Sequence, residues 1–146
     1  MAYKGKFTPK NIHKYQGDHT KIIYRSLWER KFMVFCDGNR NVLEWSSEEI
    51  AIPYISPIDG KIHRYYVDFW IKIKTKNNIE EYLIEIKPYK ECTNPNINNK
   101  TNLSKKELKE ITKWEVNKQK WKYANNFAKE NNIKFKILTE HHLGIK

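Results

Sequence analysis

The sequence predicts an α/β (α+β) fold in which helices cover both faces of a mixed sheet. Two Ser-x-x-Glu capping boxes begin stretches with helical spacing. Three apolar strand candidates lie between those stretches, and a short strand candidate follows the second helix. The predicted order is therefore helix, three strands, helix, strand. Strands this apolar need cover on both faces, which the two helices can supply.

The first helix is expected to begin at Ser26, the N-cap, with Glu29 at its third position. Apolar residues then recur with a helical period, and the Asp-Gly-Asn segment at 37–39 ends the helix. The apolar residues of this stretch are Leu27, Trp28, Phe32, Met33, Phe35 and Cys36.

Three strands are expected next, at residues 50–55, 61–74 and 80–87. Pro53 places the first at a sheet edge or a bulge. Turn residues separate the strands: Pro-Ile-Asp-Gly at 57–60 and Asn-Asn at 77–78. We expect the three strands to form an antiparallel meander.

The second helix is expected to run from the capping box of Ser104 and Glu107 to about Asn131. Residues 88–103 before it lack periodicity, which is typical of a mobile loop, and residues 134–138 form the last strand. One face of the helix carries Leu108, Ile111, Trp114, Trp121, Ala124 and Ala128, and Lys118 falls on that same face.

Length and charge constrain the function. A chain of 146 residues suits one domain, which we place at 23–140 between a basic N-terminal arm (1–22) and a short tail (141–146). Lys and Arg number 28 against 17 acidic residues, a net charge of +11, which favours a polyanionic partner over a merely soluble surface. The arm is either disordered or laid along a phosphate backbone.

Several classes are excluded. Cys36 and Cys92 form no CxxC pair, which argues against a zinc site or a disulfide scaffold and fits a reducing compartment. No apolar run is long enough to span a bilayer, so we expect no membrane partner. The chain also lacks a Gly-rich phosphate loop, a Ser-His-Asp array and an HExxH motif, so no nucleotide cofactor is expected. The adjacent His141 and His142 are assigned to the tail, because neighbouring residues rarely bind one metal together.

The residues with catalytic potential lie on the predicted strands. Asp68 ends a basic, aromatic run, and Glu85 and Lys87 are two apart on one strand, so they share a face while Ile84 and Ile86 point into a core. Burying either charge alone is costly. A divalent cation between Asp68 and Glu85, also bound by the Ile86 carbonyl, resolves that cost and predicts a metal-dependent phosphodiesterase site.

The roles within this site stay open at the level of sequence. Lys87 either orients or deprotonates the attacking water, or stabilises charge on the phosphate. Glu29 joins the cluster if its helix begins near Asp68, and is otherwise only a capping residue. Asp68 could equally pair with Arg64 or Lys72, and Glu85 with Lys87 in a solvated ion pair.

Basic side chains supply the candidate DNA contacts, although any single lysine is more often a solvated charge. Trp114 and Trp121 could stack on bases, but core packing is the favoured role. The candidate phosphate contacts are Lys4, Lys6, Lys10, Lys14, Arg25, Arg64, Lys118 and Lys122.

The motif Val67-Asp68 followed by Glu85-Ile86-Lys87, in αβββαβ order, resembles the PD-(D/E)xK nuclease superfamily, with Val67 at the nominal proline. Segments 26–29, 45–48 and 64–69 resemble the TnsA-like endonucleases within it. Strings at 1–6, 9–12, 14–18, 114–117, 120–121 and 133–140 are similar to the head completion proteins of T4-like phages, over nearly the whole chain.

This resemblance implies a restriction-endonuclease-like core and a Mg²⁺-dependent DNA endonuclease, with Mn²⁺ able to substitute. It implies Glu29, Asp68, Glu85 and Lys87 as catalytic residues, with Glu29 as a further metal ligand. It also implies action in head completion and neck assembly after DNA packaging, with portal or neck proteins as partners, in the host cytoplasm and the virion. Two other hypotheses are a structural virion protein that binds DNA or the portal, and an RNA-directed or repair nuclease.

Overall fold

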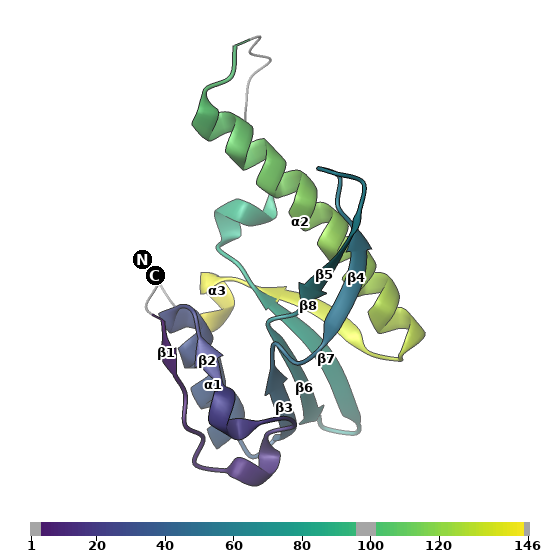
Figure 1. Cartoon of the computed structure of the whole chain (residues 1–146). Helices are drawn as coiled ribbons and strands as arrows, with labels where there is room; N and C mark the ends of the chain where they lie inside the picture. Colours follow the sequence, from purple (N-terminus) through teal and green to yellow (C-terminus); the bar gives the residue numbers. More distant parts are fainter. Residues whose placement is uncertain (1–3, 96–101, 145–146) are drawn as a thin grey trace.

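The computed structural model describes residues 4–95 and 102–144, and its centre is a four-stranded mixed sheet (Figure 1). The strand order is β3-β6-β7-β8, with β8 parallel to β7 and the other neighbours antiparallel. The bounds are β3 Val42–Ser47, β6 Phe69–Lys74, β7 Ile79–Ile86 and β8 Lys134–Leu138, with helices α1 Leu27–Gly38 and α2 Lys105–Glu130. The order α1, β3, β6, β7, α2, β8 confirms the predicted fold class.

Helices cover both faces of this sheet, as expected (Figure 1). On the α1 side, Phe32 and Met33 pack with Trp45, Phe69 and Ile84 of the strands. On the other side α2 packs through Trp121, Ala124 and Ala128, together with Leu83 of β7. Ile84 and Leu83 thus face opposite layers, as alternation along a strand requires.

The predicted strand at 61–74 is wrong, because it consists of two strands in different sheets. β5 Ile62–Tyr66 pairs with β4 Ala51–Ile55 in a separate two-stranded hairpin, and β6 then enters the central sheet. The chain crosses between the sheets at Val67 and Asp68, where the Val67 amide donates to the carbonyl of Ile50. The predicted meander of 50–55, 61–74 and 80–87 is therefore corrected.

The first strand of the central sheet is β3, which sequence reasoning missed. Its sequence Val-Leu-Glu-Trp-Ser-Ser lacks alternation, and Ser46 and Ser47 are buried although polar. A bulge between Val42 and Glu44 shifts its register against β6. These features hide the period of two that identifies strands in a sequence.

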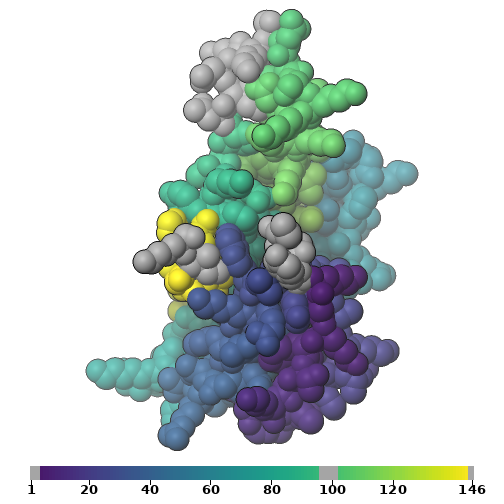
Figure 2. All heavy atoms as spheres, turned by 90° about the vertical axis from the view of Figure 1, so that its left-hand side faces the viewer, coloured from purple at the N-terminus to yellow at the C-terminus, as the bar shows by residue number. Residues whose placement is uncertain are grey.

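The described part of the N-terminal segment is folded, which corrects the prediction of an extended arm. β1 Gly5–Lys6 pairs with β2 Ile23–Tyr24, and two 3₁₀ helices, η1 Ile12–Lys14 and η2 His19–Lys21, lie between them. Phe7, Tyr15 and Ile22 are buried in the core on the α1 side. Figure 2 shows the purple N-terminal segment lying against the blue α1 region. These three buried side chains, which lie between the lysines in the sequence, pack the N-terminal segment against the domain.

Helix α2 confirms its predicted start and most of its predicted face. The Ser104 hydroxyl accepts from the Glu107 amide, and Glu107 accepts from the Ser104 amide, which completes the capping box. The first turns of α2 project beyond the sheet, so Leu108 is 51% exposed (Figure 1). Only the later part of the predicted apolar face therefore reaches the core.

The segments predicted as loop and tail contain short helices. η3 Tyr89–Cys92 occupies the start of the predicted loop at 88–103, of which residues 96–101 lie outside the described residues. α3 Glu140–Leu143 contains His141 and His142 and packs Leu143 against the core, so these residues are not a loose tail. Within residues 4–95 and 102–144, every helix is too short or too polar to span a lipid bilayer.

Candidate active site

Asp68 lies where the chain leaves the β4–β5 hairpin and enters the central sheet. Its Oδ2 accepts a 2.8 Å hydrogen bond from the amide of Ile86, at the end of the neighbouring β7. Its carbonyl accepts from the Glu48 amide at 3.1 Å, which joins the end of β3. Asp68 is therefore fixed between two strands of the sheet, and the predicted pairing of Asp68 with Arg64 or Lys72 is not what the structure shows.

Glu85 and Lys87 lie on the same side of β7, as the sequence predicted. The Glu85 side chain is buried, with Oε1 accepting from the Tyr65 hydroxyl at 2.6 Å and Oε2 at 3.6 Å from the Lys87 ammonium. Ile84 and Ile86 point into the opposite core. The Lys87 amide donates to the carbonyl of Leu138, which continues the pairing with β8 and holds this end of β7 in place.

The surroundings of Asp68 disfavour the negative charge of its carboxylate. Loss of hydration raises its pKa well above the usual value, and the nearby Glu85 carboxylate raises it further, followed by Glu29. The Ile86 amide and the Lys87 ammonium act in the opposite direction and do not cancel the effect. A proton or a cation beside Asp68 would therefore be stabilised.

Glu29 takes the predicted third position of α1, but its carboxylate does not complete a capping box. The Glu29 amide donates to the Ser26 hydroxyl at 3.2 Å, so Ser26 caps α1 as predicted. The Glu29 carboxylate accepts from the Arg25 amide at 3.4 Å instead of completing the box at Ser26. Burial raises the pKa of Glu29, and its charge acts on Asp68. The capping glutamate therefore borders the cluster.

Glu48 is one residue near the site that sequence reasoning missed. Its carboxylate lies 3.1 Å from Nε of Arg25, and its charge also raises the pKa of Glu29. Its backbone has a φ of 53°, a conformation that L-residues other than Asn and Asp seldom adopt. No signal in the sequence marks a glutamate for this conformation. The Arg25 charge in turn acts on Glu29 and Asp68, which places Arg25 beside the acids.

The lysine that α2 brings toward the acids is Lys120, whereas Lys118 does not lie on the buried face of α2, contrary to the prediction. Lys118 is exposed and pairs with Glu115 at 3.1 Å over the ring of Trp114. Lys120 is half-buried, and its ammonium lies 5.5 Å from the ring centroid of Tyr65. Burial lowers the pKa of Lys120, while the charges of Glu85 and Asp68 raise it.

The remaining candidate DNA contacts differ in exposure. Lys14 is buried, and its ammonium donates to the carbonyls of Asp37 and Asn39, so it is not free to contact a phosphate. This corrects the prediction for Lys14. The exposed candidates are Lys4, Lys6, Lys10, Arg25, Arg64, Lys118 and Lys122. Trp121 is buried and packs edge-on against Trp114, which confirms its core role.

The donor set suits a magnesium ion. No three His, Cys, Asp or Glu side chains of residues 4–95 and 102–144 are arranged to hold a metal by themselves. Mg²⁺ commonly uses one or two carboxylates together with waters and substrate phosphates, so such a cage is not required. Asp68 and Glu85 offer hard oxygen donors, and the raised pKa of Asp68 shows that its surroundings disfavour its bare charge. The residues present therefore fit this cation.

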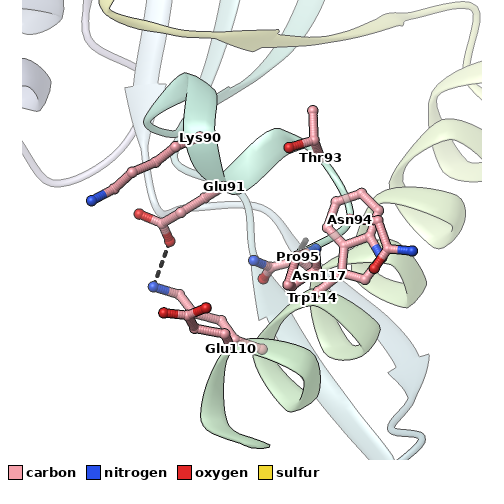
Figure 3. A pocket seen from close by; sticks show the side chains of 9 residues that line it. Lys90, Glu91, Thr93, Asn94, Pro95, Glu110, Trp114 and Asn117 are labelled. Carbon is pink, nitrogen blue, oxygen red and sulfur yellow. Dashed lines mark ion pairs between the residues drawn. The ribbon is translucent and has the colours of Figure 1, made fainter. Parts of the chain in front are cut away.

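A hollow of about 510 Å³ lies elsewhere, between η3 and α2 (Figure 3). Two of its lining residues, Glu91 and Lys113, form an ion pair. Neither Asp68 nor Glu85 lines this hollow. Its lining residues are Lys90, Glu91, Thr93, Asn94, Pro95, Glu110, Lys113, Trp114 and Asn117.

Comparison with known proteins agrees with this geometry. Residues 39–140 match the family model described as TnsA-like endonuclease N terminal. The chain is also 46% identical over 142 residues to the head completion nuclease of Enterobacteria phage T4, a match that covers 96% of this chain and 93% of that protein. The matched range contains β3, the hairpin, Asp68, Glu85, Lys87 and α2. The chain therefore belongs to the TnsA-like endonuclease N-terminal family.

Proposed function

We propose that the chain is a metal-dependent DNA endonuclease of PD-(D/E)xK type that acts in phage head completion. The observation that carries this proposal is the close pair of acids, Asp68 and Glu85, linked through the Ile86 amide and flanked by Lys87. The name of the relative in phage T4 supports the setting. The net charge of +11 supports DNA as the substrate.

Asp68 and Glu85, with the carbonyl of Ile86, are the residues that would hold Mg²⁺, and Mn²⁺ would substitute for it. When bound, such a cation supplies a Lewis acid and lowers the pKa of a bound water. Lys87 holds a positive charge 3.6 Å from Glu85, where it orients the attacking water or stabilises charge on the phosphate. Glu29 borders the site as a further ligand, directly or through water.

DNA reaches the acids over a basic surface in this proposal. Arg25 lies beside Glu29 and Asp68, and its ion pair with Glu48 fixes the guanidinium near them. Arg64 is exposed on the hairpin that carries Tyr65. We place the activity in the host cytoplasm during assembly and in the head or neck of the virion, with portal or neck proteins as partners.

The test is cleavage of linear, circular, branched and single-stranded DNA in Mg²⁺, Mn²⁺ or EDTA. Wild type should convert circular DNA to nicked or linear forms only with a divalent cation. Asp68→Asn and Glu85→Gln should each lower the rate by at least about a thousandfold while remaining folded. Cleavage that persists in EDTA, or that survives both substitutions, would contradict the proposal.

A second candidate function is a structural virion protein that binds DNA or the portal and keeps the nuclease fold as a scaffold. One observation favours it: both Glu85 oxygens already have partners, Tyr65 and Lys87. This candidate gives salt-sensitive DNA binding with no hydrolysis of any of these substrates in Mg²⁺ or Mn²⁺.

A further inference from the structure

Lys120 lies on the buried stripe of α2, although it is a lysine. The buried residues of this stripe are Asn117, Trp121, Ala124 and Ala128. Lys120 is three residues after Asn117 and four before Ala124, so it projects from the same side of the helix. That side faces the layer of the sheet from which Glu85 projects with Leu83. A lysine in this place needs an explanation.

Two aromatic rings hold the Lys120 ammonium in position. It lies 5.5 Å from the ring centroid of Tyr65 and 5.8 Å from that of Tyr54, both on the inner face of the β4–β5 hairpin. Aromatic faces attract cations at these distances and leave their N–H groups unused. The two rings therefore orient the ammonium and still allow it to donate hydrogen bonds.

The ammonium lies close to the candidate active site without pairing with an acid. Tyr65 presents its ring to Lys120 and its hydroxyl to Glu85, so one side chain links the two. Within residues 4–95 and 102–144, no carboxylate lies in ion-pair contact with Lys120. Lysines nearer the surface behave differently: Lys113, Lys118 and Lys134 each pair with a glutamate.

We propose that Lys120 is a phosphate-binding residue of the active site, whose ammonium donates to a phosphate oxygen of the DNA strand being cut, next to the cleaved bond. The inference rests on the proposed function and adds a residue to it. An unpaired, preoriented cation beside two acids attracts the one anion that must come close to them. Lys120 then contributes from α2, and Lys87 from β7.

The first test is DNA binding without metal, so that no hydrolysis is required. Binding of a fluorescent duplex is measured in EDTA over a range of salt for wild type, Lys120→Gln, Lys120→Met and Lys120→Arg. The Gln and Met variants should bind several-fold more weakly. The slope of log binding constant against log salt concentration (the salt slope) should be smaller in magnitude by about one. The Arg variant should restore the slope. Lys129→Gln, an exposed lysine in the last turn of α2, is the matched control.

A purely structural role predicts something else. If Lys120 only packs between Tyr54 and Tyr65, Lys120→Gln lowers the melting temperature and leaves the salt slope equal to that of wild type. Lys120→Met keeps the apolar stem against both rings, so it stays folded if the Gln variant does not. An unchanged slope in a folded Gln or Met variant overturns the proposal.

The second test is single-turnover cleavage in Mg²⁺ at saturating DNA. Lys120→Gln should cut at least about tenfold more slowly than wild type even when fully bound. An unchanged rate at saturation overturns the placement beside the cleaved bond. If wild type binds but does not cut, the proposed function fails, and the salt slope still decides whether Lys120 contacts a phosphate.

Discussion

The Tyr65 hydroxyl donates a 2.6 Å hydrogen bond to Oε1 of Glu85 and thereby ties the β4–β5 hairpin to the central sheet at a candidate catalytic acid. Burial raises the pKa of Tyr65, and the Glu85 carboxylate raises it further, so the hydroxyl stays protonated as a donor. The position of Glu85 and the orientation of the hairpin are therefore coupled. Losing a partner that orients a metal-binding acid typically costs about 10–100-fold in activity.

Tyr65→Phe should lower DNA cleavage by about 10–100-fold, because Glu85 loses the group that orients it. It should also lower the free energy of unfolding by about 1–2 kcal/mol, since a buried acceptor loses its partner. Rates and urea unfolding measure the two effects. Tyr66→Phe is the matched control, because Tyr66 is exposed and next in sequence. Equal activity of both variants would contradict the orienting role.

Sequence reasoning succeeded where local chemistry decides the structure. Ser26 and Ser104 both cap helices, because a hydroxyl placed before a helical stretch satisfies its free amides whatever lies around it. Glu85 and Lys87 share a face because alternation along a strand is local as well. These signals needed no knowledge of the tertiary fold.

Sequence reasoning failed where distant contacts decide. The crossing at Asp68 breaks an apolar run into two strands of different sheets, because β5 pairs with β4 and β6 pairs with β3 and β7. Lys120 was missed because Trp114 was taken as part of the buried stripe of α2 in place of Asn117. With Asn117, Trp121 and Ala124 as the stripe, helical spacing alone would have pointed to Lys120.

Asp68→Asn should stabilise the metal-free chain at neutral pH by roughly 0.5–2 kcal/mol, although it abolishes cleavage. The pKa of Asp68 is raised in the folded state, so the folded chain binds this proton more tightly than the unfolded chain does. The stability that protonated Asp68 contributes to the wild type is therefore lost as the pH rises through its folded-state pKa. It is regained as the pH falls toward the usual pKa of a carboxyl group. The gain from the variant should shrink in acid accordingly.

Thermal unfolding in EDTA across pH measures this difference. Asp59→Asn is the control with the opposite expected effect on stability, because the Lys61 amide and His63 lower the pKa of Asp59. The ionised Asp59 therefore stabilises the folded chain at pH values above the usual carboxyl pKa, and this stabilisation is lost in acid. Asp59→Asn should not stabilise the chain at neutral pH. A wild type that is more stable than Asp68→Asn at neutral pH would contradict the unfavourable charge assigned to Asp68.

Mg²⁺ should raise the melting temperature of wild type, because a ligand that binds only the folded state stabilises it. At one hundred times its dissociation constant, the gain is about 2.7 kcal/mol. Asp68→Asn and Glu85→Gln should lose most of this gain, and Asp59→Asn should keep it. EDTA should reverse it. An equal shift in all four proteins would place the cation elsewhere.

Glu48→Gly should be about 1 kcal/mol more stable than Glu48→Ala, because glycine adopts a φ of 53° without the strain that a Cβ causes. Both variants lose the ion pair with Arg25, so the comparison isolates the backbone. Both should also weaken DNA binding if Glu48 positions Arg25 for a phosphate. Urea unfolding and binding in EDTA measure the two effects. Equal stability of both variants would show that no strain is stored at Glu48.

Lys14→Met should lower the free energy of unfolding by about 1–3 kcal/mol, because the carbonyls of Asp37 and Asn39 at the end of α1 lose the buried ammonium and keep only their second donors, the Asn11 amide and the Val42 N–H. A positive charge at this helix end is also favourable. Lys10→Met is the matched control: the Lys10 side chain is exposed, and only its backbone amide bonds to Asp37. That variant should change stability by less than about 0.5 kcal/mol.

The same two variants separate a lysine of the fold from one that contacts DNA. Lys14→Met should leave the salt slope of DNA binding unchanged, because the buried ammonium touches no phosphate. Lys10→Met should reduce that slope by about one if its exposed ammonium contacts the backbone. A smaller slope for Lys14→Met, with stability intact, would mean that the segment 4–22 opens to bind DNA and releases Lys14 from the carbonyls of Asp37 and Asn39.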